Sequence, residues 1–456
     1  MQTDLVRLVP HPTARNKASA VTPLTSGSII TSVPCLSTSL LPSMKGKRCD
    51  GCLQLPSEHI SLRKCTGCGS FWYCGTTCQA REWKLHHKAI CKLYNRYIAS
   101  PEYQTLSPHD QVDAILLSQL LAQVPPDSDG AFATFLELLP GPPAFGGVPP
   151  ICRKHISPDI LDVAKNLYSR FGNNNFVLHS HLDAYAHGIF PLASRLFNHS
   201  CTPNSATKYI ITPSEPVRME VVALRDISAD EEVTIPYLDP ALPYETRQEA
   251  LRMNYGFTCT CSLCTFSQRL GHVPRPPSRD SEELTSMEAE LRRFVFGTTD
   301  GITRIRTESE LFTDMPVGLH PLLHESYLPG VSELFSKASH EGPYQDALKI
   351  GSTLLVFPCL TSVVMWKLIR AIAIVMLAML GMHALEMAKT AWNLIVSEDE
   401  RGNESVTVAP NRRETIQQAK SHLDIASQIL RNFGAEGDED GPLEEIRLLQ
   451  PLLDSY

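Results

Sequence analysis

The sequence predicts an α+β protein in which zinc-binding segments accompany a core of short strands and a helical C-terminal region. Three observations support this. Eleven of the fourteen cysteines and one histidine fall at metal-ligand spacings, short strand-like segments crowd residues 175–237, and residues 281–456 have helical patterning. With 456 residues, the chain is long enough for about two to four domains and a sizeable core.

The first 44 residues are rich in Ser, Thr and Pro. Within them, residues 19–22 and 28–33 read as strands separated by a turn at residues 23–27. The first thirty residues lack the basic segment and continuous apolar run of a secretory signal. We therefore expect the paired cysteines to be metal ligands rather than disulfides.

Residues 45–95 contain eight potential ligands in four close pairs. The pairs are Cys49 with Cys52, Cys65 with Cys68, Cys74 with Cys78, and His87 with Cys91. This order suggests two interleaved zinc sites, with the first and third pairs sharing one metal and the second and fourth pairs the other. So short a segment buries little apolar area, so metal binding would supply its folding free energy. The neighbouring His86 does not fit the His-x3-Cys spacing, and we expect it at the surface.

A third site is predicted from four further cysteines. Cys259, Cys261 and Cys264 form a close trio, and Cys201 lies alone within Asn198-His199-Ser200-Cys201. Twelve ligands then fill three closed four-ligand sites, which leaves no position for water and favours structural over catalytic zinc. The remaining cysteines fit no site and are expected to be buried or free thiols; they are Cys35, Cys152 and Cys359.

Helical spacing of apolar residues predicts two helices within residues 107–139, broken at Pro125-Pro126, and another at residues 158–171. Residues 219–224 give the clearest strand. Pro243 then opens a helix that Gly256 can close.

Residues 271–280 form a proline-rich linker, and the helical region beyond it is interrupted by a polar loop near residues 397–411. Its most apolar stretch is residues 360–385, but Lys367 and Arg370 interrupt that stretch. The uncharged part is about fifteen residues, shorter than the roughly 20 that cross a bilayer. Buried bundle helices are therefore the better interpretation, and no membrane contact is expected.

The charge is unevenly distributed. The chain carries −8 in total, yet between Lys45 and Arg96 there are ten Lys or Arg against three Asp or Glu. The net charge argues against a protein that wraps nucleic acid along its length. The basic module suits local contact with an acidic partner, although basic residues also serve simply to keep a zinc module soluble.

Three blocks in fixed order carry a resemblance to a known family. They are Asn198-His199-Ser200-Cys201-x-Pro203-Asn204, Glu231-Glu232-Val233-Thr234-Ile235-Pro236-Tyr237, and Asn254-Tyr255-Gly256-Phe257-Thr258-Cys259-Thr260-Cys261. They resemble the SET methyltransferase fold and its cysteine-rich post-SET segment. The zinc module resembles a MYND finger, including Gln79 and Trp83 after Cys78. Together they resemble the SMYD family, in which a MYND finger is inserted into a split SET domain.

This resemblance implies a domain order. Residues 1–44 would be the N-terminal part of the split SET domain, since residues 20–24 and Gly27 match its first strands. The remaining domains would be the MYND finger at 45–95, a helical SET insertion at 96–172, the SET core at 173–240, the post-SET segment at 241–265 and a helical C-terminal domain at 266–456. That last domain resembles the family's tetratricopeptide-like domain loosely, most clearly around residues 429–434.

The resemblance further implies an S-adenosylmethionine-dependent protein-lysine N-methyltransferase that acts on histone or non-histone proteins. Asn198 and His199 would contact the cofactor, and Phe257 would pack on its adenine. Asn174 matches another cofactor-binding asparagine, and Tyr237 matches the tyrosine at the reaction centre. Zinc shared by Cys201 and the later trio would clamp the post-SET segment over the cofactor.

One position departs from the family pattern. The family carries Gly-x-Gly before its first strand, where this chain has Arg15-Asn16-Lys17. Asn16 can still reach the cofactor, but side chains occupy positions where close backbone approach was needed. The alternative is therefore a catalytically weak or inactive scaffold that binds protein partners.

Several expectations about partners follow. MYND fingers bind short proline-containing peptides, and nucleic acid contact is also open, as is a purely structural finger. A DNA-binding transcriptional protein is a third hypothesis, disfavoured by the charge of −8 and the absence of a recognition-helix pattern. We expect a monomer, and both nucleus and cytoplasm remain open as compartments.

Overall fold

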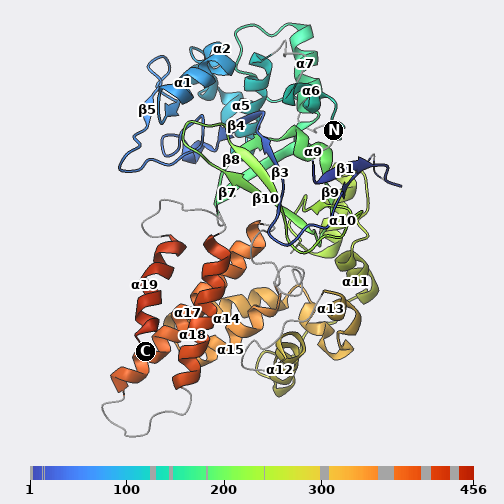
Figure 1. Ribbon diagram of the computed structural model, residues 1–456, viewed down its shortest axis with the longest axis vertical. Coiled ribbons are helices and arrows are strands. Elements are labelled where there is room, and N and C mark those ends of the chain that lie inside the picture. The colour runs from blue at the N-terminus through green and yellow to red at the C-terminus, as the bar shows by residue number, and fades with distance from the viewer. Residues whose placement is uncertain are drawn as a thin grey trace.

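The computed structural model describes residues 4–12, 14, 16–123, 130–142, 147–180, 183–240, 242–297, 308–357, 374–401, 412–431 and 441–455. A strand-rich half with the zinc module lies above a helical half that is formed by the C-terminal part of the chain (Figure 1). This is the predicted α+β class, with a helical C-terminal region.

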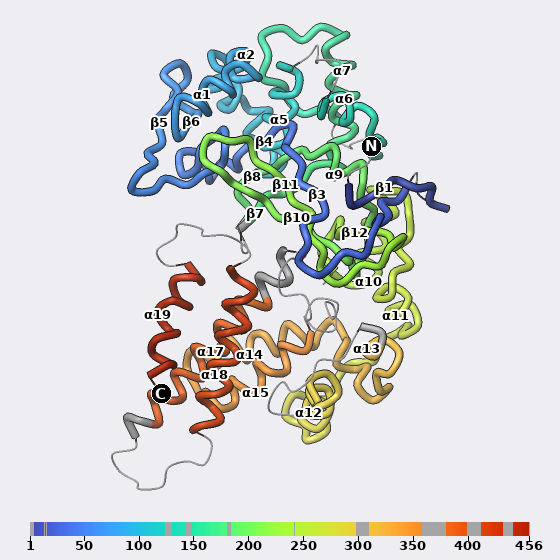
Figure 2. The backbone as a smooth tube through the Cα atoms, in the orientation of Figure 1, coloured from blue at the N-terminus to red at the C-terminus, as the bar shows by residue number. Residues whose placement is uncertain are grey.

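Short strands form five small sheets among the described residues. The strands are β1 (Val6–Val9), β2 (Lys17–Ala20), β3 (Ile29–Pro34), β4 (Ser37–Leu40), β5 (Arg63–Lys64), β6 (Trp72–Tyr73), β7 (Asn175–Ser180), β8 (Asp183–Ile189), β9 (Asn198–His199), β10 (Ser205–Ile210), β11 (Arg218–Ala223) and β12 (Thr234–Ile235). One sheet has the order β10-β11-β3, and another has the order β4-β8-β7. Strands from before the zinc module thus pair with strands from after it, as the tube in Figure 2 shows for β3 and β11.

The predicted strand, turn and strand near the N-terminus form, but the two strands do not pair with each other. β2 pairs with β1, and β3 pairs with β11. The turn between them is held by the later chain instead: the Leu24 amide donates to the Ile227 carbonyl at 2.9 Å, and the Gly27 amide donates to the Ala223 carbonyl at 2.9 Å. Gly27 has a φ of 82°, a left-handed conformation that glycine adopts without strain.

A buried apolar cluster joins β2, β3, β11 and the segment that carries β12. Among its fully buried members are Val221, Val233 and Ile235, and Leu196 and Phe197 complete it from the chain before β9. Each such side chain contributes about 1.5–3 kcal/mol through its burial. This cluster fixes the segments that later carry the polar side chains of the site.

The zinc module contains β5, β6 and a nearly continuous helical run. That run comprises α1 (Thr76–Glu82), the π-helical turn η2 (Trp83–His87), α2 (Lys88–Ile90) and α3 (Tyr94–Ile98). Two arginines dock the module on the strands. The Arg81 guanidinium donates to the Ser214 carbonyl in the β10–β11 turn at 2.7 Å, and the Arg48 guanidinium lies 4.2 Å from the centre of the Tyr185 ring on β8.

His86 is a correction to the sequence prediction. We expected it at the surface, but it is only 5% exposed. Its Nε2 lies 2.9 Å from a carboxylate oxygen of Glu82, one helical turn earlier, and Glu82 also accepts from Arg81 at 2.9 Å. The Arg81–Glu82–His86 chain of contacts therefore lets polar groups lie buried where the module meets the rest of the protein.

Helices then lead to the strand core. They are α4 (Pro101–Gln104), α5 (Pro108–Ala122), α6 (Ala131–Leu136), α7 (Pro158–Tyr168), α8 (Phe171–Asn174) and α9 (Pro191–Leu196), with the short 3-10 turn η1 (Pro42–Met44) beside them. α5 begins at a capping serine, because the Ser107 hydroxyl accepts from the Asp110 amide. The separation of α5 from α6 agrees with the predicted break, although Pro125 and Pro126 themselves lie outside the described residues.

α10 (Tyr244–Tyr255) is the helix predicted from the residues at its start and end. Pro243 stands at its start, and Gly256 closes it in a left-handed conformation with φ 75°. α11 (Ser262–Leu270) follows and begins directly after Cys261. α10 thus precedes the third predicted cysteine cluster, and α11 carries its last member, Cys264.

The remaining described elements are helical: α12 (Glu282–Phe296), α13 (Glu308–Asp314), η3 (Val317–Leu323), α14 (Tyr327–Glu341), α15 (Tyr344–Leu354), α17 (Ile374–Arg401), α18 (Arg412–Leu430) and α19 (Pro442–Asp454). No helix within the described ranges is both long and apolar enough to span a bilayer. Residues 358–373, including Lys367 and Arg370, lie outside the described residues. So do 402–411 of the predicted polar loop and the last residues of the segment 429–434.

Candidate active site and zinc clusters

The structure gathers the twelve predicted ligands into three groups of four. The groups are Cys49, Cys52, Cys74 and Cys78; Cys65, Cys68, His87 and Cys91; and Cys201, Cys259, Cys261 and Cys264. Within each group, all ligand atoms lie within 4.8 Å of one another. The first two groups interleave along the chain as the sequence suggests.

Each donor set fits zinc. Thiolate sulfur and imidazole nitrogen are the ligands of structural zinc, and four of them close its tetrahedral shell. In the second group, His87 Nε2 lies 3.3 Å from Cys65 Sγ and 3.6 Å from Cys68 Sγ. Burial lowers the pKa of His87 to about 4, so its imidazole is neutral at pH 7 and has a lone pair to offer a metal.

The third group joins two distant stretches of chain. Cys201 follows β9 and is fully buried, with its sulfur 3.6 Å from Cys264 Sγ and 4.0 Å from Cys259 Sγ. Gln248 on α10 holds the main chain at Cys259 from both sides. Its amide donates to the Cys259 carbonyl at 2.9 Å and accepts from the Cys259 N–H at 3.0 Å.

The cysteines outside these groups are placed as expected where the structure describes them. Cys152 is buried and Cys35 is half-buried, and both are free thiols. Burial raises the pKa of each to about 12, so both stay protonated at neutral pH. Cys359 lies outside the described residues.

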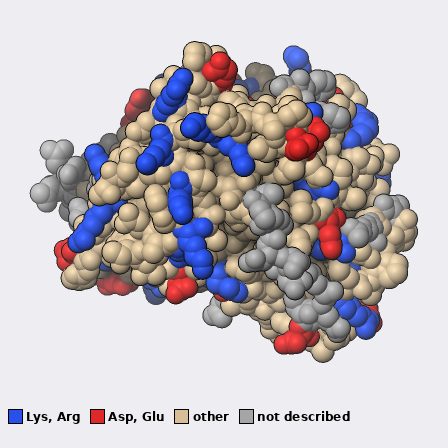
Figure 3. Space-filling model, turned by 90° about the horizontal axis from the view of Figure 1, so that it is seen from above, with Lys and Arg blue, Asp and Glu red and all other residues tan. Residues whose placement is uncertain are grey.

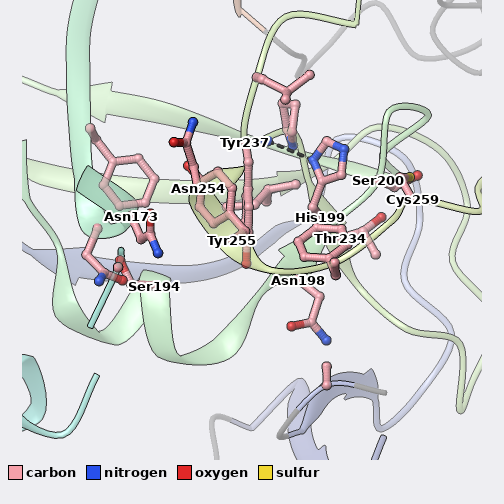
Figure 4. A pocket seen from close by; sticks show the side chains of 18 of the residues that line it. Asn173, Ser194, Asn198, His199, Ser200, Thr234, Tyr237, Asn254, Tyr255 and Cys259 are labelled. Carbon is pink, nitrogen blue, oxygen red and sulfur yellow. Dashed lines mark hydrogen bonds between the residues drawn. The ribbon is translucent and has the colours of Figure 1, made fainter. Parts of the chain in front are cut away.

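A cavity of about 1470 Å³ lies beside the third group. All six residues predicted for the cofactor site and reaction centre line it, and they come from five separate parts of the chain: Asn16, Asn174, Asn198, His199, Tyr237 and Phe257. The volume exceeds the roughly 300–1,000 Å³ of common small-molecule sites. Figure 4 shows Asn198, His199, Tyr237, Tyr255 and Cys259 around this space.

Asn198 and His199 form β9, which runs parallel to β12, with Asn198 opposite Thr234 and His199 opposite Ile235. The Asn198 amide donates to the Asn16 carbonyl at 2.8 Å and to a Glu232 carboxylate oxygen at 2.7 Å. The main chain at Asn16 therefore lies against Asn198 on the cavity wall although no glycine is present there. Arg15 lies outside the described residues.

Tyr237 follows β12 and is held at both its main chain and its hydroxyl. The hydroxyl donates to the Phe197 carbonyl at 2.6 Å, and the amide N–H donates to His199 Nδ1 at 2.9 Å. Val233 and Ile235, which precede it, are fully buried and anchor the strand. Burial raises the pKa of Tyr237, so its phenol stays protonated at neutral pH.

Tyr255 is a cavity residue to which the sequence assigned no role. Its ring centre lies 4.8 Å from that of Tyr237 and 6.3 Å from that of Phe257, so the three rings form one aromatic wall with His199. Burial raises the pKa of Tyr255 as well. Its place one residue before Gly256, the residue that ends α10, was the available signal.

Two further residues were missed because they act by holding others. Glu232 accepts from Asn198, and Asn204 accepts from the Thr234 amide at 2.8 Å while donating to the Glu232 carbonyl at 2.7 Å. The predicted Asn174, which also lines the cavity, is 7% exposed and donates to the Arg170 carbonyl at 2.8 Å. These contacts preorganise the cavity wall.

Comparisons with known proteins agree with this architecture. The SET domain family matches residues 70–238, and the MYND finger family matches residues 45–91. The two matched domains, together with SMYD proteins among the relatives, support the resemblance to the SMYD family. The SET match begins after the N-terminal strands, which join the SET region because β3 pairs with β11 and β4 pairs with β8.

Curated relatives of this chain include histone-lysine N-methyltransferase ASHR1 of Arabidopsis thaliana, which is 29% identical over 48% of this chain and 46% of its own length. N-lysine methyltransferase SMYD2-B of Danio rerio is 25% identical over 62% of this chain and 65% of its own length. Histone-lysine N-methyltransferase SMYD3 of Homo sapiens is 27% identical over 55% of this chain and 59% of its own length. The chain thus spans about half to two thirds of the length of these relatives.

Proposed function

We propose that this protein is an S-adenosylmethionine-dependent protein-lysine N-methyltransferase, with histone or non-histone lysines as substrates. One observation carries the proposal. Six residues predicted to serve cofactor binding line one cavity, and its Tyr237 and Phe257 wall lies directly beside the third zinc cluster. The names of the relatives, which are lysine methyltransferases, support the same reaction.

When bound, S-adenosylmethionine supplies an electrophilic methyl group. The aromatic wall suits its adenine, with Phe257 as the predicted packing partner. Acceptor groups near Asn198, among them the Glu232 carboxylate, suit its cationic part. The residues present therefore fit this cofactor.

Tyr237 has the right hydrogen bonding to orient a lysine amine. Because its hydroxyl proton is committed to the Phe197 carbonyl, the oxygen lone pairs are left to accept an N–H from the amine. The amine lone pair can then point away from Tyr237, toward the methyl donor. The raised pKa of Tyr237 keeps this arrangement through the neutral pH range.

The aromatic wall also favours the neutral form of a lysine amine packed against it, because desolvation disfavours the ammonium ion. Rate acceleration then comes from positioning and desolvation rather than from a covalent intermediate. This assigns to the protein the tasks of orienting two reactants and excluding water.

Calorimetric titration of zinc-replete protein with S-adenosylmethionine tests the proposal, followed by transfer of labelled methyl to lysine-containing proteins. We expect saturable binding, and Tyr237→Phe should lower transfer by about a hundredfold while changing cofactor affinity little. Tyr168→Phe, which removes a hydroxyl on α7 away from the cavity, is the matched control. No binding heat and no transfer would favour the scaffold alternative.

We further propose that the finger binds protein partners through an exposed apolar pair. Trp83 and Leu85 are 41% and 44% exposed, and indole faces are suitable surfaces for proline rings. Lysine and arginine outnumber acidic side chains on the upper face of the molecule, where the finger lies (Figure 3), so a proline-containing peptide with acidic flanks fits best. Quenching of Trp83 fluorescence by such peptides, absent in Trp83→Ala, tests this; equal affinity in that variant would contradict it.

A further inference from the structure

The imidazole of His199 has two hydrogen-bond partners that belong to different functional parts of the protein. Its Nε2 lies 3.2 Å from Cys201 Sγ, in the third cluster. Its Nδ1 accepts from the main-chain N–H of Tyr237 at 2.9 Å, the contact drawn as a dashed line in Figure 4. One side chain thus connects a metal ligand with the residue that we assign to the reaction centre.

The two contacts define the tautomer of this ring. A main-chain N–H can only donate, so Nδ1 must offer its lone pair, and in the neutral imidazole the proton is on Nε2. Nε2 therefore donates to the sulfur of Cys201, and a zinc-bound thiolate is a better acceptor for it than a thiol. Groups that hydrogen-bond a metal ligand in this way orient it and tune its affinity for the metal.

The need for this contact follows from the sheet. β12 ends at Ile235, so Tyr237 lies beyond the last ladder pair of β9 and β12. Its amide is bonded by a side chain instead of a neighbouring strand. His199, opposite Ile235, replaces the missing ladder partner and is itself held by the cluster through Cys201.

We propose that His199 is a positioning residue that ties the third zinc cluster to the main chain of Tyr237, so that zinc binding there fixes where the phenol lies. The part that concerns catalysis rests on the proposed function. The structural tie does not, because metal retention and the order of the Tyr237 amide can be measured without cofactor or substrate.

Two conservative variants separate the contact of His199 with Cys201 from its contact with the Tyr237 amide. His199→Asn keeps an acceptor near the Nδ1 position but has nothing that reaches Cys201 Sγ. His199→Gln places an amide N–H near the Nε2 position but lacks the acceptor for the Tyr237 amide. Each variant is a control for the stability of the other, and the two finger clusters are an internal reference for zinc.

The measurements are zinc release to excess chelator and amide exchange in protein labelled with ¹⁵N-tyrosine, with the Tyr237 signal assigned by its loss in Tyr237→Phe. We expect His199→Asn to release one of three zinc ions about 10–100-fold faster while the metal-loaded form keeps the Tyr237 amide protected. His199→Gln should retain zinc and exchange that amide at least about tenfold faster. If methyl transfer is found, His199→Gln should lower kcat with little change in the lysine substrate KM.

Equal losses in both variants would mean that the ring acts only by packing, and this would overturn the proposal. Unchanged zinc release in His199→Asn, or unchanged Tyr237 exchange in His199→Gln, would overturn it as well. Absence of methyl transfer with the expected zinc and exchange results would refute the proposed function and leave the tie standing.

Discussion

Gln248 provides a sharp test of how the third cluster is built. Its side chain pairs with both the N–H and the carbonyl of Cys259 and is 7% exposed. Gln248→Met keeps the length of the side chain but leaves two enclosed main-chain groups without partners. Each such loss costs about 1–3 kcal/mol, so the two together should destabilise the segment around Cys259 by about 2–6 kcal/mol.

A change of that size makes local opening at least about thirtyfold more frequent. We therefore expect one of three zinc ions to leave Gln248→Met far faster than it leaves the wild type, with the two finger ions unaffected, as followed with a chromophoric chelator. Gln119→Met is the matched control, since Gln119 is a buried glutamine on α5 that accepts from the Ser37 hydroxyl at 2.8 Å. Uniform release of all three ions, or unchanged release, would refute the reasoning.

Two further predictions concern other parts of the molecule. Arg81→Met removes the bonds to the Ser214 and Gly51 carbonyls and should lower the free energy of unfolding by about 1–3 kcal/mol in denaturant titrations; unaltered stability would show that the finger docks by other contacts. Burial lowers the pKa of His422 in α18 to about 4. Below pH 6.5 the unfolded chain therefore binds a proton at this histidine, whereas the folded chain binds it only near pH 4. Stability should therefore fall between pH 6.5 and 4, by at most about 3 kcal/mol, and His422→Phe should flatten that dependence; identical pH profiles would contradict the assignment.

The parts of the site that could be predicted are those encoded by local spacing. The twelve ligands pair as expected, because Cys-x2-Cys and His-x3-Cys spacings let neighbouring side chains reach one metal. α10 was likewise predictable, since Pro243 favours a helix start and Gly256 tolerates the left-handed conformation that ends it.

The parts that could not be predicted depend on contacts between distant segments. Nothing near β3 indicates that it pairs with β11 rather than β2, because strand partners are chosen by packing of the whole sheet. His86 was misplaced for a related reason: its burial depends on Glu82 and on the docking of the finger by Arg81. Tyr255 was missed because its place before Gly256 marks a helix end but does not indicate a cavity, which forms only when distant segments pack together.

The proposed active site depends on Cys201 sharing a metal with the trio at Cys259, Cys261 and Cys264. The most direct measurement is the number of zinc ions per chain in the wild type and in Cys201→Ala, determined by elemental analysis of the purified proteins. Three ions in the wild type and two in the variant are the predicted result. Two ions in both proteins would show that the cavity wall is not held by a metal, and would contradict the account.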